Sequence, residues 1–440
     1  MLLNLLYKYK ILEVNKKFKI IKLLFVQLNS LPYTFHKEGV SMLGSKIRTL
    51  RKALGLTQSE LAGNHMTKGM LSQIENGKAA PSMSTLEYLA KQLGCEPSDL
   101  LDEKEDYLPL LEEIKNDRKK ENYSSIYGKL SKIVSEHMPR DVIEAKLYSL
   151  YAEAGLQLNK PNMKNYIEWA AAYFQTKSLF LDSAEALWIY HYYCQRHRKW
   201  EESLACLSEI RKQFTGNGLE ENIVFQLRLF LDEGIDLLAL EEYEKAHLKM
   251  MDAITLSKET NVYTRMDDIY RIAASYPLMM KDEKEFLRLL TKSEQYAIFS
   301  ENKMALMMFP LLYAVYHNEI TKDYKKALTY LEDYAKIPDK VDELYYLEYG
   351  KALYGLGKIE QALESLRKCK LSNMLAHPID IAMVYTAGVY IALCLNQQGY
   401  KKEALEQINK TCDLLEIMPK SVYYKFANEV RENLIQEKGN

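Results

Sequence analysis

The sequence predicts an all-α protein, with several short helices near its N-terminus and a long array of paired helices behind them. Glycine and proline are scarce, with 18 and 11 residues in 440, which favours long helices over a turn-rich β fold. Apolar residues recur at helical spacing through most of the chain. One segment pattern also returns at intervals of 35 to 43 residues, as expected of stacked helical hairpins.

Charge is divided unevenly along the chain. The formal net charge is −1, but residues 1–41 carry +5, residues 42–101 carry +2, and the remainder carries −8. Any contact with nucleic acid is therefore expected near the basic N-terminal end.

Residues that carry catalytic or metal chemistry do not cluster. The six cysteines form no C-x-x-C pair, and there is no H-E-x-x-H, no G-x-S-x-G and no phosphate-binding glycine loop. We therefore expect no metal, no cofactor and no enzymatic activity. The cysteines are expected to be buried, reduced thiols of a cytosolic protein: Cys95, Cys194, Cys206, Cys369, Cys394 and Cys412.

The first 41 residues are apolar stretches interrupted by lysines, so they fit neither a membrane span nor a secretory signal. One reading is a basic amphipathic helix on a membrane surface. We favour another, in which the codons for Lys37-Glu38-Gly39 resemble a ribosome-binding site and translation begins at Met42. Residues 1–41 would then be a mis-annotated extension; the alternative is a disordered basic extension, and we expect no membrane contact.

From Met42 the sequence predicts short helices. The first has apolar residues at helical spacing and ends at Gly55, with its core face formed by Ile47, Leu50 and Leu54. The second begins at Thr57, because Thr57 and Glu60 have the spacing of a capping box.

Three further helices complete residues 42–102. Thr67 is expected to cap a third helix that ends near Asn76, and Ser84, with Glu87 three residues on, a fourth. The fourth helix has one apolar face, formed by Leu86, Leu89, Ala90 and Leu93. A fifth begins within "CEPSDLL". Short helices around a tight turn indicate a helix-turn-helix domain.

This segment resembles the lambda-repressor-like, XRE-type DNA-binding domains over its whole length. The resemblance is carried by Leu56-Thr57-Gln58-x-x-Leu61-Ala62, by Leu71-Ser72-x-Ile74-Glu75-x-Gly77-Lys78-x-x-Pro81-Ser82, and by Thr85-Leu86-x-x-Leu89-Ala90.

The third helix is expected to read DNA. At ~100° per residue, Leu71 and Ile74 point into the core. The outward positions are then Gly69, Ser72, Gln73 and Asn76. Lys68 lies at the helix N-terminus, where it can donate to guanine or phosphate, while Gln73 can pair with adenine.

The resemblance adds further roles. It implies DNA contacts for Gln58 and Thr67, and phosphate contacts for Asn76 and Lys78; Lys46 is a further backbone candidate. Gly69 stands where the family often has a base-reading side chain, so readout is expected to depend on Lys68, Gln73 and DNA shape. The resemblance also pairs Glu75 with Arg51, which makes both scaffold residues.

C-terminal to residue 102, the sequence is dominated by a repeated pattern of apolar and charged residues. Its segments include "EYEKAHLKMMDAI", "KIEQALESLRKC" and "YKKEALEQINKTC", and its anchor positions are Ser203, Ala246, Phe286, Ala327, Ala362 and Ala404. Twelve residues earlier a small residue recurs as the close-packing point between the two helices of a hairpin: Gly234, Gly350 and Ala392.

This pattern resembles tetratricopeptide repeats, with His191 and Val315 as departures where a small residue is expected. We expect residues 103–440 to be a repeat domain for peptide sensing and dimerisation, with about seven hairpins. An additional pair is expected in "VIEAKLYSLYAEAGLQL" and "NYIEWAAAYF".

Such an array has a concave inner face. Amide side chains there can bond a peptide backbone, and basic ones its carboxylates. The repeat template and the looser units place nine residues on that face: Arg228, Arg271, Tyr316, Asn318, Lys351, Tyr354, Thr386, Asn396 and Gln397. The competing reading is a solvated polar face, with the many tyrosines and methionines as core.

The two parts together resemble the Rap–Rgg–NprR–PlcR–PrgX group of bacterial peptide-pheromone receptors. The resemblance implies a cytoplasmic, homodimeric transcription regulator that binds double-stranded DNA at a palindromic operator and responds to a short signalling peptide. The alternative is an adaptor whose array binds a folded partner, such as a phosphorelay response regulator.

Overall fold

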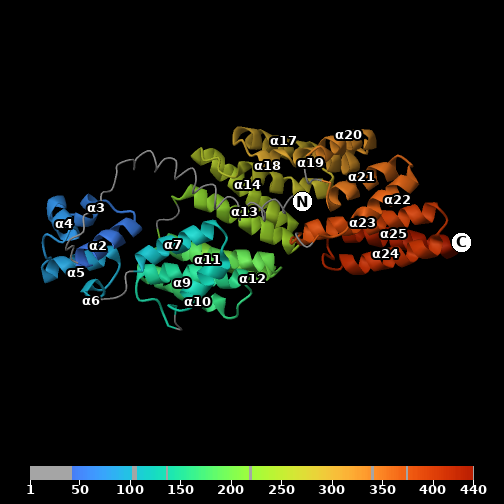
Figure 1. The fold of residues 1–440 in the computed structure, drawn as a ribbon. Helices are drawn as coiled ribbons and strands as arrows, with labels where there is room; N and C mark the ends of the chain where they lie inside the picture. Colours follow the sequence, from blue (N-terminus) through green and yellow to red (C-terminus); the bar gives the residue numbers. More distant parts are fainter. Residues whose placement is uncertain are drawn as a thin grey trace. The chain divides into compact units, whose positions relative to one another are not determined.

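The computed structural model describes residues 42–101, 107–134, 137–217, 221–337, 341–372 and 375–439. Every regular element in these ranges is a helix (Figure 1), which confirms the all-α prediction. The expectation for residues 1–41 lies outside the described residues. The chain divides into two compact units, with the boundary between residues 193 and 194, and each is described by itself.

The first unit begins with five short helices: α2 (Met42–Ala53), α3 (Gln58–Ala62), α4 (Lys68–Glu75), α5 (Met83–Leu93) and α6 (Pro97–Leu101). The predicted capping box is present at α3, where the Thr57 hydroxyl accepts from the Glu60 N–H and the Glu60 carboxylate accepts from the Thr57 N–H. The Thr67 hydroxyl caps α4 by accepting from the Met70 N–H at 3.1 Å.

The expected start of the fourth helix is wrong. Ser82, not Ser84, is the N-cap of α5, and its hydroxyl accepts from the Thr85 N–H at 3.2 Å. Both serines have the spacing of a cap, but the Ser82 hydroxyl also lies within hydrogen-bond distance of the Ser84 and Thr85 hydroxyls. This local network stabilises the earlier start.

The helices of this domain pack around a small apolar core. Ile47, Leu71 and Ile74 are at most 1% exposed, as the predicted faces require. Gly44 allows α2 to approach the end of α4, because a Cβ at this position would overlap the Ile74 carbonyl oxygen. The placement of α4 therefore depends directly on α2.

The rest of the first unit consists of longer helices, paired as α7 with α8 and α9 with α10: α7 (Leu108–Lys119), α8 (Tyr123–Leu130), α9 (Val142–Gln157), α10 (Met163–Thr176) and the start of α11 (Phe180–Arg196). The pair α9–α10 is the additional hairpin expected from the sequence.

The second unit also consists largely of paired helices. Its helices are α12 (Trp200–Phe214), α13 (Ile223–Ala239), α14 (Tyr243–Thr260), α15 (Met266–Ala273), α16 (Ser275–Met280), α17 (Glu283–Phe299), α18 (Lys303–Leu306), α19 (Phe309–Tyr316), the π-helical turn η1 (His317–Thr321), α20 (Tyr324–Ala335), α21 (Glu343–Gly355), α22 (Ile359–Lys368), α23 (Pro378–Gln397), α24 (Lys401–Leu415) and α25 (Val422–Gly439). One apolar core extends through it, from Leu227 to Leu434.

The repeat pattern corresponds to packing. All six anchor residues are at most 1% exposed. A Cβ at Gly234 would lie 3.7 Å from the Ala246 carbonyl oxygen, and one at Gly350 would lie 3.4 Å from that of Ala362. The small residues are therefore the predicted points of close approach between paired helices.

Two helices of the array are interrupted. Pro277 has no N–H and its ring crowds the carbonyl of residue 273, so the first helix of its hairpin breaks into α15 and α16. The helix that begins with α19 ends in η1, which starts two residues after Val315. Such π turns occur often at functional sites.

Helix α23 is long and apolar enough to cross a membrane by composition alone. However, 67% of its apolar window is buried, and it packs against α24 and α25. Its apolar character is that of a core helix in this array.

Candidate functional site

The exposed face of α4 is the first candidate site. Lys68, Gly69, Gln73 and Asn76 are exposed, and Lys78 is exposed just beyond the helix; Ser72 is half-buried. Leu71 and Ile74 point the other way, into the core. The expected outward residues thus share one polar surface, with donors and acceptors of the kind that bind base edges and phosphates.

A buried ion pair fixes this helix in the domain. Arg51 donates to both carboxylate oxygens of Glu75, Nε to Oε1 at 2.6 Å and Nη2 to Oε2 at 3.0 Å. Arg51 also donates to the Leu56 carbonyl at 2.8 Å. Gln58 Nε2 donates to Glu75 Oε2 at 2.8 Å, so Glu75 links α2, α3 and α4. The expected scaffold pair is present, and it also holds Gln58.

Two residues near this surface were missed by sequence reasoning. Arg48 Nη1 lies 3.5 Å from Asn76 Oδ1, so α2 places a cation beside the end of α4. Met70 on α4 is 42% exposed and adds an apolar group to the polar face. Their positions along the helices could have indicated that Arg48 and Met70 lie at this surface, but neither residue is part of the motif that carries the family resemblance.

The nine residues expected on the concave face lie in different settings. Arg271, Tyr316 and Asn318 are buried: Arg271 pairs with Asp268, the Tyr316 hydroxyl donates to Glu283 at 2.7 Å, and Asn318 Nδ2 donates to Glu348 at 2.9 Å. Gln397 donates to the Tyr354 hydroxyl and Asn396 to Glu437. Arg228 is half-buried on α13. The structure brings only two of the nine, Lys351 and Thr386, to one cavity.

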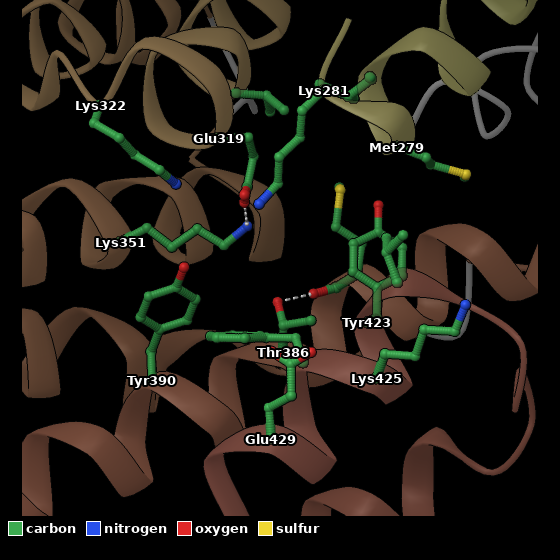
Figure 2. A pocket seen from close by; sticks show the side chains of 15 residues that line it. Met279, Lys281, Glu319, Lys322, Lys351, Thr386, Tyr390, Tyr423, Lys425 and Glu429 are labelled. Carbon is green, nitrogen blue, oxygen red and sulfur yellow. Dashed lines mark hydrogen bonds and ion pairs between the residues drawn. The ribbon is translucent and has the colours of Figure 1, made fainter. Parts of the chain in front are cut away.

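This cavity, called the lysine pocket below, has a volume of about 330 Å³ and lies within the second unit (Figure 2). It is lined by residues of α16, α19, η1, α21, α23 and α25 and of the turns that follow α16 and η1. Its polar lining residues are Lys281, Glu319, Lys322, Lys351, Thr386, Tyr390, Tyr423, Lys425 and Glu429. Its apolar lining residues are Leu278, Met279, Val315, Met383, Val422 and Phe426.

Lys351 is the buried cation of the pocket. Its side chain is 4% exposed, and Nζ donates to Glu319 and Glu348, at 2.8 Å each. Burial acts to lower the pKa of Lys351, but the two carboxylates outweigh it, and the pKa lies well above its usual range. Lys351 therefore stays charged.

Glu319 lies among three lysines. Burial acts to raise its pKa, but Lys351, then Lys322 and Lys281, outweigh this effect, and the pKa of Glu319 is lowered. Figure 2 shows the Lys281 side chain pointing towards Glu319 from the turn after α16. Burial, together with Lys281 and Lys351, lowers the pKa of Lys322, whose Nζ donates to the Asn318 carbonyl at 2.9 Å.

The π turn positions this wall. Within η1, Asn318 bonds Glu348 while its neighbour Glu319 bonds Lys351, so consecutive residues both reach α21. In a regular α-helix, adjacent side chains point about 100° apart. Thr386 of α23 was expected here, but the other polar lining residues of α23 and α25, which include Tyr390, Tyr423 and Lys425, were missed because no motif marks them.

Among the residues that the structure describes, no group of three His, Cys, Asp or Glu side chains is arranged to hold a metal ion. All six cysteines are free thiols, but Cys206 and Cys369 are half-buried rather than buried as expected. Burial raises the pKa of Cys95 and Cys369 to about 12, which leaves both protonated and weakly nucleophilic at neutral pH.

Comparisons with known proteins find a family match for the domain that carries the first candidate site. Residues 47–100 match the helix-turn-helix family, so this segment is a helix-turn-helix domain. The competence pilus inhibition repressor of Acinetobacter baylyi is 42% identical over 59 residues, which are 13% of this chain and 54% of that protein. The chain thus spans about half the length of this curated relative.

Two solved structures of PlcR from Bacillus thuringiensis are also similar. One is a complex with the peptide PapR7 and DNA, at 21% identity over 59% of this chain and 95% of that one, with a TM-score of 0.35. The other is the apo form, at 19% identity over 59% and 94%, with a TM-score of 0.34.

Proposed function

We propose that this protein is a sequence-specific DNA-binding transcription regulator. The observation that carries the proposal is the exposed polar face of α4, presented by a helix-turn-helix domain. Gln73 reads bases, Lys68 donates to guanine or phosphate, and Asn76 and Lys78 bind phosphates. Gln58 and Thr67 are further DNA contacts. Gly69 lets the helix approach the groove closely.

The array is proposed to sense a short signalling peptide. The lysine pocket supports this role, because it combines apolar walls with cations, hydroxyls and a volume in the range of small-ligand sites. A peptide offers both kinds of group to such a surface. Six free thiols suit the cytoplasm, where an imported peptide would meet the protein.

The regulator is proposed to act as a homodimer on a palindromic operator. One eight-residue recognition helix contacts only a few base pairs, which gives too little discrimination among the sites of a genome. Two copies related by a two-fold axis double the readout and require an operator with the same symmetry.

Genome-wide binding of the chain that begins at Met42, with and without a peptide extract of spent host medium, tests the proposal. We expect discrete palindromic sites whose occupancy changes with the extract. Discrete sites whose occupancy does not change with the extract would support the DNA-binding role, but would favour a folded protein, rather than a peptide, as the partner of the array. The absence of sites under both conditions would refute the DNA-binding role.

A further inference from the structure

We propose that the lysine pocket binds a free C-terminal carboxylate carried by an apolar residue, and that Glu319 occupies the carboxylate position until the ligand displaces it. The inference deepens the proposed function. It rests on the proposed sensing of a peptide, because the carboxylate is that of a peptide.

The polar wall of the pocket is suited to an anion. Lys281, Lys322 and Lys351 surround Glu319, and Thr386 and Tyr390 place hydroxyl groups at the same cavity (Figure 2). Lys351 has three N–H donors and uses two of them for Glu319 and Glu348. A ligand carboxylate therefore finds a buried, charged donor with further lysines around it.

The apolar wall identifies which carboxylate fits. The cavity that contains the lysines is also lined by apolar side chains, those of Leu278, Met279, Val422 and Phe426. In a C-terminal residue the carboxylate and the side chain share one carbon atom, so an apolar C-terminal residue presents both groups together. An Asp or Glu side chain has its carboxylate at the tip and brings no apolar group beside it. The mixed lining favours the C-terminus.

The two carboxylates on Lys351 differ in their freedom to move. The Glu348 side chain is 0% exposed and also accepts a hydrogen bond from Asn318. The Glu319 side chain is 32% exposed and lies in the π turn at the cavity wall. Glu319 can therefore move towards solvent without leaving a buried charge unpaired, and it is the carboxylate that an incoming anion replaces.

Charge decides the direction of the test. With Glu319 ionised, a ligand carboxylate meets a competing negative charge at the same lysines. The Glu319→Gln substitution removes that charge and preserves size, so it should strengthen anion binding. Glu364→Gln is the matched control, because Glu364 forms an exposed pair with Lys368 at the same 2.8 Å.

The probes are two pools of random hexapeptides that end in Leu, Ile, Val or Phe, one with a free C-terminus and one with a C-terminal amide. Each pool is incubated with the full chain, and retained peptides are quantified by mass spectrometry after gel filtration. We expect the free-acid pool to be retained at least tenfold more than the amide pool. Glu319→Gln should raise its retention about tenfold, which corresponds to about 1.4 kcal/mol, while Glu364→Gln should leave it unchanged.

A second variant protects the result against a folding defect. Lys281 is exposed, so Lys281→Met should keep the fold but lower retention of the free-acid pool severalfold. Equal retention of both pools, with no effect of Glu319→Gln, would overturn the inference and leave peptide binding by the array intact. Retention of amidated peptides rich in Asp or Glu would overturn the C-terminal assignment. Retention of neither pool would refute both the pocket and the peptide part of the proposed function.

Discussion

Glu75 shows how one residue fixes the recognition surface. Its carboxylate is buried at the centre of the domain, where it accepts from Arg51 of α2 and Gln58 of α3 while belonging to α4. Breaking a buried pair by removing one partner leaves an uncompensated charge, which is strongly destabilising. We expect Arg51→Ala to destabilise the domain by about 3 kcal/mol and to lower its melting temperature in calorimetry.

The neighbouring Lys52 supplies the control, because it is exposed on the same helix turn. Lys52→Ala should change stability by less than about 0.5 kcal/mol. If Arg51→Ala melts at the wild-type temperature, the pair has no structural role, and Arg51 becomes a candidate for direct contact with DNA.

Gln73 is expected to read bases. Gln73→Ala should weaken binding to the operator by about 1–3 kcal/mol and spare non-specific affinity, because it removes a base contact and no charge. Fluorescence anisotropy with operator and scrambled duplexes at one salt concentration measures both. Equal losses on the two duplexes would show that Gln73 is not a base reader.

His377 makes the array sensitive to acid. Its imidazole is 1% exposed at the start of α23; one ring nitrogen lies 3.1 Å from the Ile235 carbonyl and the other accepts from the Ile379 N–H at 3.2 Å. Burial, the main cause, lowers the pKa of His377 to about 3. Since the unfolded chain takes up this proton near pH 6.5 and the folded chain does not, stability falls as pH drops from about 6.5 towards 3.

The expected loss is about 1.4 kcal/mol per pH unit in that window. His377→Asn keeps a capping side chain and cannot be protonated, so its melting temperature should fall less steeply between pH 7 and pH 5. If the melting temperatures of the two proteins fall equally between pH 7 and pH 5, His377 is not a buried neutral imidazole.

At the scale of elements, the hairpin turns are under a common backbone constraint. Each of several turns between paired helices contains a residue whose backbone lies in the left-handed region of φ/ψ space. These residues include Glu121, Asn159, Arg198, Glu241, Lys322, Gly357 and Gly399. Gly357 has φ +73° and open space around its Cβ position, so a substitution there reports on backbone strain alone. We expect Gly357→Ala to destabilise the array by about 1–2 kcal/mol in urea unfolding.

Gly128 is the matched control. It lies inside α8, also with open space around its Cβ position. Gly128→Ala should be neutral or stabilise by up to about 1 kcal/mol, because alanine favours the helix. A similar loss for both substitutions would mean that the side chain, rather than the positive φ, is responsible.

At the scale of the whole molecule, the number of copies bound to the operator determines how many DNA phosphates are neutralised. Each proposed phosphate contact contributes about 0.9 to the slope of log K against log salt concentration. For a homodimer on a palindrome, Lys78→Ala removes two contacts and should reduce the slope by about 2, against about 1 for a monomer. Titrations between about 50 and 200 mM salt measure this change. Lys91→Ala, at an exposed position of α5, should leave the slope unchanged.

Local chemistry allowed much of the fold to be predicted. Thr57 and Thr67 cap helices through hydrogen bonds to residues three positions away, and Gly234 and Ala246 pack because their spacing spans one hairpin. The error at Ser84 has the same origin, since Ser82 offers an equivalent local pattern and wins through a further hydroxyl network.

The sequence by itself determined the helical class, the helix-turn-helix face and the repeat anchors, because these depend on neighbours within one or two helical turns. Only the tertiary structure decided the lysine pocket. Lys281 comes from the turn after α16, Lys351 from α21 and Lys425 from α25, and the π turn that contains Glu319 interrupts the regular α-helical register. Which face of each helix meets a shared cavity depends on how successive hairpins stack, and that packing is set by contacts far apart in the chain.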